Sequence, residues 1–205
     1  MKNILFVLMA LAFVSCKKGK TDFKIVGKVN DITFSNGMAN TSVEIYKASA
    51  NSTSPDNFKT ITTDAAGNFT IDIKRDQFSF LEFIVSKDGY FTETKRIYFK
   101  DLSVESDNNI ALDVNGKGWV KVRFLNQNDN EAIMKYYNTE GKFDCAECCV
   151  SGMNTLTGLV DTTYYCVNNA GKNYQVKYAK SFTSFNGLKN IITPFQDTVE
   201  ILIEY

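Results

Sequence analysis

The residues best suited to chemistry in this chain are its cysteines. Cys145, Cys148 and Cys149 crowd the stretch FDCAECCVSG (143–152), and Cys166 follows further along. Four chemistries are compatible with these residue types. They are thiol–disulfide exchange through the C-x-x-C pair, a zinc site of four thiolates, a cysteine nucleophile, and structural disulfides.

The absence of histidine from all 205 residues bears on each of these chemistries. A cysteine nucleophile lacks its usual base, and a zinc site lacks its commonest ligand. The C-x-x-C-C spacing provides one zinc knuckle but no second one, and no strand–helix pattern surrounds the C-x-x-C pair as thiol exchange requires. Structural disulfides are therefore favoured, and no catalytic residue, cofactor or metal site is predicted.

Two disulfide connectivities are open, because a bond between the adjacent Cys148 and Cys149 is strained. They are 145–148 with 149–166, and 145–149 with 148–166. Neighbouring residues of an extended chain point to opposite faces, so only one of Cys148 and Cys149 can face Cys166. We favour Cys149–Cys166 together with a small Cys145–Cys148 ring.

The start of the chain resembles a bacterial lipoprotein signal of the Bacteroidota type. Lys2 precedes an apolar run, Ile4 to Val14, which is too short to span a membrane, and the small residue Ser15 then precedes Cys16. The resemblance implies that residues 1–15 are removed and that Cys16 carries the lipid. Residues 16–21 would then tether the protein to a membrane of the cell envelope, most simply the outer membrane, and their basic character favours the periplasmic face.

Composition and periodicity indicate an all-β protein. Sixteen Phe and ten Tyr favour strands, and 23 basic against 23 acidic residues argue against a nucleic-acid partner. Alternating or buried-strand patterns recur between turn signals. They cover 24–29, 42–47, 68–73, 80–85, 109–114, 119–124, 162–167, 174–178 and 198–205. We predict two consecutive β-sandwich domains of the transthyretin or immunoglobulin type, 22–115 and 118–205, divided by the Gly/Asn-rich segment 113–119.

Five motifs carry a resemblance to a known family. They are IVGKVND (25–31), TSVEIY (41–46), TTDAAGNFTI (62–71), VSKDGY (85–90) and NIALDV (109–114). In order and spacing they resemble the carboxypeptidase regulatory-like, or transthyretin-like, β-sandwich, over about half of the chain. The resemblance implies a module without catalytic activity of its own.

The residues of these motifs are also explained by folding alone. We expect Asp64 to cap a turn, Gly67 to adopt a positive φ, and Phe69 to return the strand to the core. Gly89 is expected to adopt a positive φ as well, and Tyr90 to pack over the edge of the sandwich.

Two further features of the second half are candidate binding sites. The polar run 126–131 could hold calcium, but it does not fit an EF-hand loop, and a hairpin turn is favoured. Aromatic residues could form a binding platform, although strand aromatics more often pack in the core. They are Trp119, Tyr136, Tyr137, Tyr164, Tyr165, Tyr174 and Tyr178.

These observations predict a lipid-anchored envelope protein that binds or scaffolds an envelope protein or a glycan, without catalysis. One alternative is a glycan hydrolase that uses a pair of carboxylates, which an acidic pair in a deep cleft would favour. Another is a thiol oxidoreductase, which an exposed Cys145 of low pKa would favour.

Overall fold

The computed structural model describes residues 21–180 and 187–205. Strands make up the regular structure of these residues, apart from one 3-10 turn, η1 (Phe99–Asp101). The predicted all-β class is thus confirmed. No helix within the described ranges is long and apolar enough to cross a membrane.

Two sheets enclose the first hydrophobic core. In one sheet β1 is central, antiparallel to β2 and β5 and parallel to β8. The other sheet is antiparallel, in the order β4-β3-β6-β7. The strands are β1 (Asp22–Asp31), β2 (Asn36–Gly37), β3 (Ser42–Ser49), β4 (Asp56–Thr62), β5 (Asn68–Lys74), β6 (Phe78–Val85), β7 (Glu93–Tyr98) and β8 (Asn108–Val114).

Alternation along these strands creates the first core. Ile25 and Val29 of β1 are fully buried, as is Phe83 of β6 on the facing sheet. Gly27 lies directly opposite Phe69 in the register of β1 and β5. A Cβ atom at Gly27 would collide with the Phe69 ring, so the glycine makes room for the aromatic side chain.

Two further sheets enclose the second core. In the three-stranded sheet β9 lies between β12, which is antiparallel to it, and β15, which is parallel. The four-stranded sheet is antiparallel, in the order β11-β10-β13-β14. The strands are β9 (Lys117–Asn126), β10 (Ile133–Glu140), β11 (Asn154–Thr157), β12 (Val160–Asn169), β13 (Asn173–Lys180), β14 (Gly187–Ile192) and β15 (Thr198–Glu204).

Side chains from both sheets fill this second core. Phe124 of β9 packs with its ring centroid 4.2 Å from that of Tyr136 on β10. Tyr174 of β13 is fully buried beside them, and Ile203 of β15 closes the layer. The same core also contains Met134 of β10, and Ile191 of β14 packs against it. The alternation pattern did not identify these two strands.

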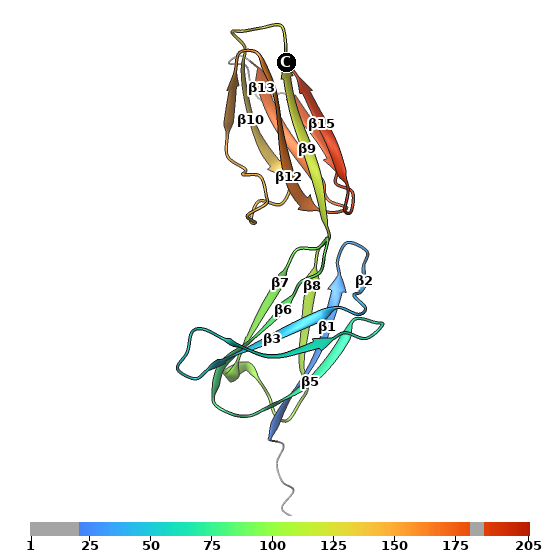
Figure 1. The fold of residues 1–205 in the computed structure, drawn as a ribbon, viewed down its shortest axis with the longest axis vertical. Helices are drawn as coiled ribbons and strands as arrows, with labels where there is room; N and C mark the ends of the chain where they lie inside the picture. Colours follow the sequence, from blue (N-terminus) through green and yellow to red (C-terminus); the bar gives the residue numbers. More distant parts are fainter. Residues whose placement is uncertain (1–20, 181–186) are drawn as a thin grey trace, which may run out of the picture.

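The two sandwiches stack end to end along the longest axis of the molecule (Figure 1). Only Asn115 and Gly116 lie between β8 and β9. The amide of Phe91 donates to the Asn115 carbonyl at 2.9 Å, and that of Ala170 donates to the Gly116 carbonyl at 2.8 Å. Backbone bonds from both sandwiches therefore hold this short connection.

An aromatic contact strengthens the same junction. Phe195 precedes β15. Its ring centroid lies 5.1 Å from that of Phe34 and 5.2 Å from that of Tyr90. Phe34 and Tyr90 belong to the first sandwich. The Tyr90 hydroxyl in turn donates a 2.7 Å hydrogen bond to Asp31, which is buried. The junction is thus a packed contact, and the connection is not a free linker.

Candidate functional site

The four cysteines form two disulfides in the favoured connectivity, Cys145–Cys148 and Cys149–Cys166. The Cα atoms are 5.1 Å apart in each pair. Residues 143–152 are a loop between β10 and β11, so the extended-chain argument for this pairing was wrong. A turn brings the first pair together instead, since the Cys148 amide donates to the Cys145 carbonyl at 3.1 Å. In this oxidised state none of these four sulfur atoms is a thiolate that could bind zinc or attack a substrate.

The second disulfide holds this cysteine loop, residues 143–152, against β12. Cys166 is buried in the second core, and Cys149 packs against that core from the loop. The Val167 amide donates to the Glu147 carbonyl at 3.4 Å, and the Cys149 Sγ atom lies 3.8 Å from the Tyr165 carbonyl oxygen. The loop therefore runs beside the C-terminal half of β12.

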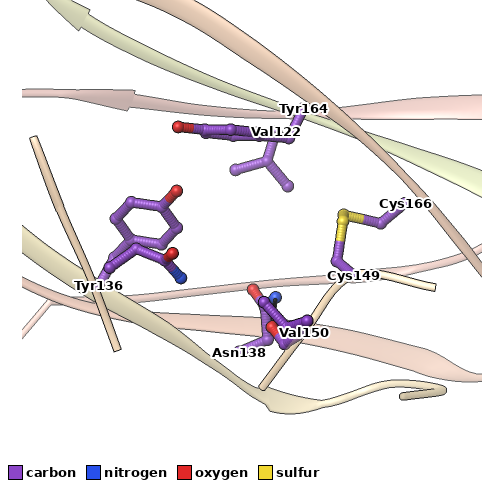
Figure 2. Close-up of a pocket in the computed structure, with 8 residues that line it drawn as sticks. Val122, Tyr136, Asn138, Cys149, Val150, Tyr164 and Cys166 are labelled. Carbon is purple, nitrogen blue, oxygen red and sulfur yellow. Dashed lines mark hydrogen bonds between the residues drawn. A yellow bond between two sulfur atoms is a disulfide. The ribbon is translucent and has the colours of Figure 1, made fainter. Parts of the chain in front are cut away.

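A cavity of about 120 Å³ lies next to this disulfide. Figure 2 shows its walls: the disulfide on one side, the rings of Tyr136 and Tyr164 on another, and Asn138 and Val150 below. The lining residues come from β9, β10, β11, β12 and the cysteine loop. They are Val122, Tyr136, Asn138, Cys149, Val150, Asn154, Tyr164 and Cys166.

The polar groups of this cavity bond to their surroundings. The Asn138 side-chain amide donates to the Val150 carbonyl at 3.0 Å, and that of Asn154 donates to the Gly152 carbonyl at 2.9 Å. Burial, followed by a hydrogen bond to Tyr164, raises the pKa of Tyr136. The Tyr136 phenol is therefore neutral at physiological pH, and the cavity, which no Asp, Glu, Lys or Arg lines, is largely apolar.

The predicted aromatic residues divide between the core and the surface. Tyr136 and Tyr174 are buried, as the packing interpretation expected. Tyr165 is 64% exposed and Tyr164 is 37% exposed, both on β12. Among the predicted aromatic residues, the two most exposed are thus neighbours on β12, and Tyr164 lines the cavity.

Sequence reasoning missed three exposed apolar residues in the loops that flank β11, one of which, Val150, lines the cavity. Val150, Met153 and Leu159 are each more than half exposed. They belong to the loops on either side of β11, where no alternation marks a strand. The only indication in the sequence was their apolar type within a glycine-containing segment, and that pattern names no function.

A second hollow, of about 420 Å³, lies at the junction of the two sandwiches. Glu93 and Asp113 line it from the first sandwich, and Lys142, Asp144 and Glu147 line it from the second. Lys142 pairs with Asp144 at 2.7 Å. Glu93 and Asp113 are thus two carboxylates that line the same groove.

The surroundings of Glu93 in this groove shift its pKa upward. Partial burial, followed by the negative charge of Asp113, raises the pKa of Glu93, while Lys95 and Lys142 oppose the shift. The amino group of Lys142 also lies 5.0 Å from the centroid of the Phe91 ring. The groove therefore mixes both signs of charge around Glu93, whose pKa is raised.

The polar run 126–131 forms the turn between β9 and β10. The Asn126 side-chain amide donates to the carbonyls of Asp129 (2.6 Å) and Gly158 (2.7 Å). The Asp129 carboxylate accepts from the Glu131 amide at 3.1 Å and pairs with Lys180 at 3.5 Å. Within the described residues, no group of three or more Asp, Glu or Cys is arranged to hold a metal ion.

The motif residues of the first sandwich take the expected positions. Asp64 accepts hydrogen bonds from the amides of Ala66 (2.9 Å) and Asn68 (2.8 Å). Gly67 and Gly89 adopt φ values of 83° and 76°. The predicted lipid site, Cys16, lies outside the described residues.

Comparisons with known proteins identify no family for this chain. No family model and no curated protein matches it. Among solved structures, the shaft pilin SpaA from Lactobacillus rhamnosus GG is similar at 10% identity and a TM-score of 0.40, over 90% of this chain and 98% of the pilin. The Bacillus anthracis TIE protein is similar at 12% identity and a TM-score of 0.38, over 90% of this chain and 34% of its own.

An enzyme is also among the similar structures. It is 3-chlorocatechol 1,2-dioxygenase from Rhodococcus opacus 1CP, at 17% identity and a TM-score of 0.35, over 49% of this chain and 62% of the enzyme. Likenesses at these scores carry no argument about function, which has to rest on the residues of this chain.

Proposed function

We propose that this chain is a non-catalytic protein of the bacterial cell envelope, anchored by a lipid on Cys16, that holds a partner at a fixed distance from the membrane. The two sandwiches would act as two domains, 22–115 and 118–205. The first would be a carboxypeptidase regulatory-like module, as its motifs suggest. The partner would be another envelope protein or a glycan.

The observation that carries this proposal is the packed junction. Phe195 contacts both Phe34 and Tyr90 across a connection of two residues. A rigid junction keeps the far sandwich in a fixed direction, which is useful to a spacer or scaffold. A flexible linker would lose this property.

The anchor is tested by expressing the full chain in a Gram-negative host and measuring the mass of its N-terminal peptide. We expect a diacylglyceryl thioether on Cys16 and recovery of the protein with membranes. A Cys16→Ser variant should lose both, whereas Ser15→Ala should retain both. An unmodified Cys16 in soluble protein would refute the anchor.

Partner binding is tested with the intact lipoprotein by chemical crosslinking in native envelopes, alongside co-sedimentation with purified cell-wall glycan. We expect one reproducible crosslinked protein or saturable sedimentation with the glycan. If neither occurs, the binding function is wrong.

Glu93 and Asp113 support a second candidate, a hydrolase that uses both carboxylates. The raised pKa of Glu93 suits a general acid, and the charge of Asp113 contributes to it. The test is release of reducing ends from cell-wall glycan and from soluble polysaccharides. Activity that Glu93→Gln abolishes, and that Glu105→Gln on the exposed surface leaves unchanged, would establish this candidate.

A further inference from the structure

The edge strand β12 is covered along only half of its free side. Among the described residues it pairs only with β9. The cysteine loop contacts the opposite side at Tyr165 and Val167 and is fixed there by the Cys149–Cys166 disulfide. Towards its N-terminal end the strand has no such cover from the described chain.

In that open half, every second residue directs its backbone N–H and C=O groups away from β9. In an antiparallel ladder, alternate residues direct their N–H and C=O groups to the same side of the strand. Asp161 and Thr163 therefore direct theirs to the side on which Tyr165 and Val167 meet the loop. No backbone hydrogen bond from a described segment outside the strands reaches Asp161 or Thr163. Such an edge is a template for an added strand.

The cavity lies where the side chains of an added strand would point. Tyr164 lines it from β12, and Asn154 lines it from β11 on the facing sheet. Because side chains alternate along a strand, every second residue of a strand beside β12 would enter the layer between the two sheets. One of these residues would meet the cavity.

The size and lining of the cavity indicate which kind of side chain from an added strand it could hold. Its volume is about 120 Å³, and a protein cavity of roughly 150 Å³ accepts benzene. The side-chain amides of Asn138 and Asn154 are already bonded to loop carbonyls. An apolar side chain of the size of Leu or Phe therefore fits, whereas a charged one would be left without a partner.

The surroundings are complementary to an uncharged segment. Val150, Met153, Leu159 and Tyr165 expose apolar surface around the edge. The one ionised side chain of β12 is Asp161, and its two oxygens accept hydrogen bonds from Arg123 at 2.8 Å each. A charged partner would gain no free counter-ion along this strand.

A second copy of this chain suits the edge less well. Two β12 strands related by a two-fold axis would pair antiparallel. Because β12 runs roughly along the long axis of the molecule, the two copies would then point in opposite directions (Figure 1). Two chains anchored at their N-termini in one membrane cannot adopt that arrangement.

We propose that the open half of β12, from Val160 to Tyr164, binds an extended, uncharged peptide segment of a partner protein by strand addition, with one apolar side chain in the cavity. This inference rests on the proposed binding function and names the class of partner. The disulfide-bound loop sets where the added strand must end.

The test uses capped, fluorescein-labelled nine-residue peptides of Ser, Thr and Asn whose central residue is Leu, Phe, Gly or Lys. Binding to residues 17–205, with both disulfides formed, is followed by fluorescence anisotropy and by NMR shifts of the β12 amides. We expect the Leu or Phe peptide to bind at least tenfold more tightly than the Gly and Lys peptides. Equal binding of all four, or no binding at millimolar concentration, overturns the proposal.

Two matched pairs of variants locate the site. Thr163→Pro removes an outward N–H without touching the ladder to β9, and Thr163→Ala keeps that N–H. Asn154→Phe fills the cavity, whereas Thr155→Phe adds the same ring on the exposed face of β11. We expect the first variant of each pair to weaken binding at least tenfold and the second to bind as the wild type does. Loss of binding in both members of a pair, or in neither, contradicts the site.

The same variants separate this inference from the proposed function. A partner crosslinked equally well by wild type and Thr163→Pro would refute strand addition and leave the scaffold function standing. Peptide binding without any envelope partner would support the site and count against the scaffold. If the protein dimerises in analytical sedimentation and Thr163→Pro abolishes the dimer, the β12 edge binds a second copy of this chain. That result would refute the peptide as its occupant.

Discussion

The ring of Phe195, from the second sandwich, lies 5.2 Å from the ring of Tyr90, from the first, at an interplanar angle of 56°. These residues are far apart in sequence, and their contact lies beside the two-residue connection between β8 and β9. The Tyr90 hydroxyl donates a hydrogen bond to Asp31, which holds the ring in position. The orientation of one sandwich against the other therefore depends on a few side chains.

Replacing Phe195 with Ala should uncouple the two sandwiches. The variant loses two ring contacts and partly buried apolar area, which we expect to weaken the coupling by about 2 kcal/mol. Trp119, the only tryptophan, reports on the second sandwich, while far-UV circular dichroism reports on both. In the wild type the two thermal transitions should coincide, and in Phe195→Ala they should separate. Phe58→Ala on β4 is the control, and coincident transitions in Phe195→Ala would refute the coupling.

Removing the Tyr90 hydroxyl should destabilise the protein and change its response to alkali. Tyr90→Phe takes one donor from the buried Asp31 carboxylate, at a cost of about 1–2 kcal/mol. Burial and the bond to Asp31 raise the pKa of Tyr90 to about 12. Its stabilising contribution is complete below pH 10 and is lost as the pH rises from 10 to 12.

Urea unfolding at pH 8, 10 and 12 checks this dependence. The difference in unfolding free energy between wild type and Tyr90→Phe should shrink across the series. Tyr46→Phe, a change on β3 away from the junction, serves as the comparison. A difference that stays constant with pH would mean that the hydroxyl does not carry the effect.

The two disulfides should contribute unequally to stability. Cys149–Cys166 closes a loop with a sequence separation of 17 and joins the buried core, so a Cys149→Ala/Cys166→Ala variant should lose about 3 kcal/mol. Cys145–Cys148 spans a separation of 3 outside that core, so Cys145→Ala/Cys148→Ala should lose less. Urea unfolding of both variants, with a non-reducing peptide map of the wild type, measures this. Equal losses, or four free thiols in protein from the envelope, would contradict the assignment.

Asp64 should stabilise the turn before β5 only while it is ionised. Backbone hydrogen bonds, that from Asn68 first, lower the pKa of Asp64 below its ordinary 3.8. The stabilising contribution is therefore present above pH 3.8 and is lost as the pH falls through the lower folded value. Asp64→Ala should lower the melting temperature at pH 7, and the deficit should shrink towards pH 2. Asp72→Ala on β5 is the control, and an NMR titration midpoint for Asp64 at or above 3.8 would refute the cap.

The regular parts of the fold were predictable because burial alternates with residue number. In β5, Phe69, Ile71 and Ile73 are buried while the residues between them are exposed. Strand β4 was missed because Ile61 is its only partly buried residue. An exposed edge strand carries no apolar alternation for a sequence pattern to detect.

The candidate site was predictable only in part. The four disulfide-forming cysteines and their two possible connectivities followed from residue types and spacing. The loop that carries three of them is not extended, so the predicted reason for the pairing was wrong although the pairing agrees with the structure. The exposed apolar residues of the loops that flank β11 could not be assigned to a surface, because a loop has no periodicity that shows which side chains face solvent.

The sequence by itself determined the all-β class, the turns at Gly67 and Gly89 and the restriction of the disulfides to two possible connectivities. These depend on local backbone preferences, alternation and the small number of cysteines. Only the tertiary structure decided that Phe195 contacts Phe34 and Tyr90, that Glu93 faces Asp113, and that β12 leaves half an edge open beside a cavity. Each of these depends on residues brought together by the stacking of sheets, and short-range patterns contain no information about such contacts.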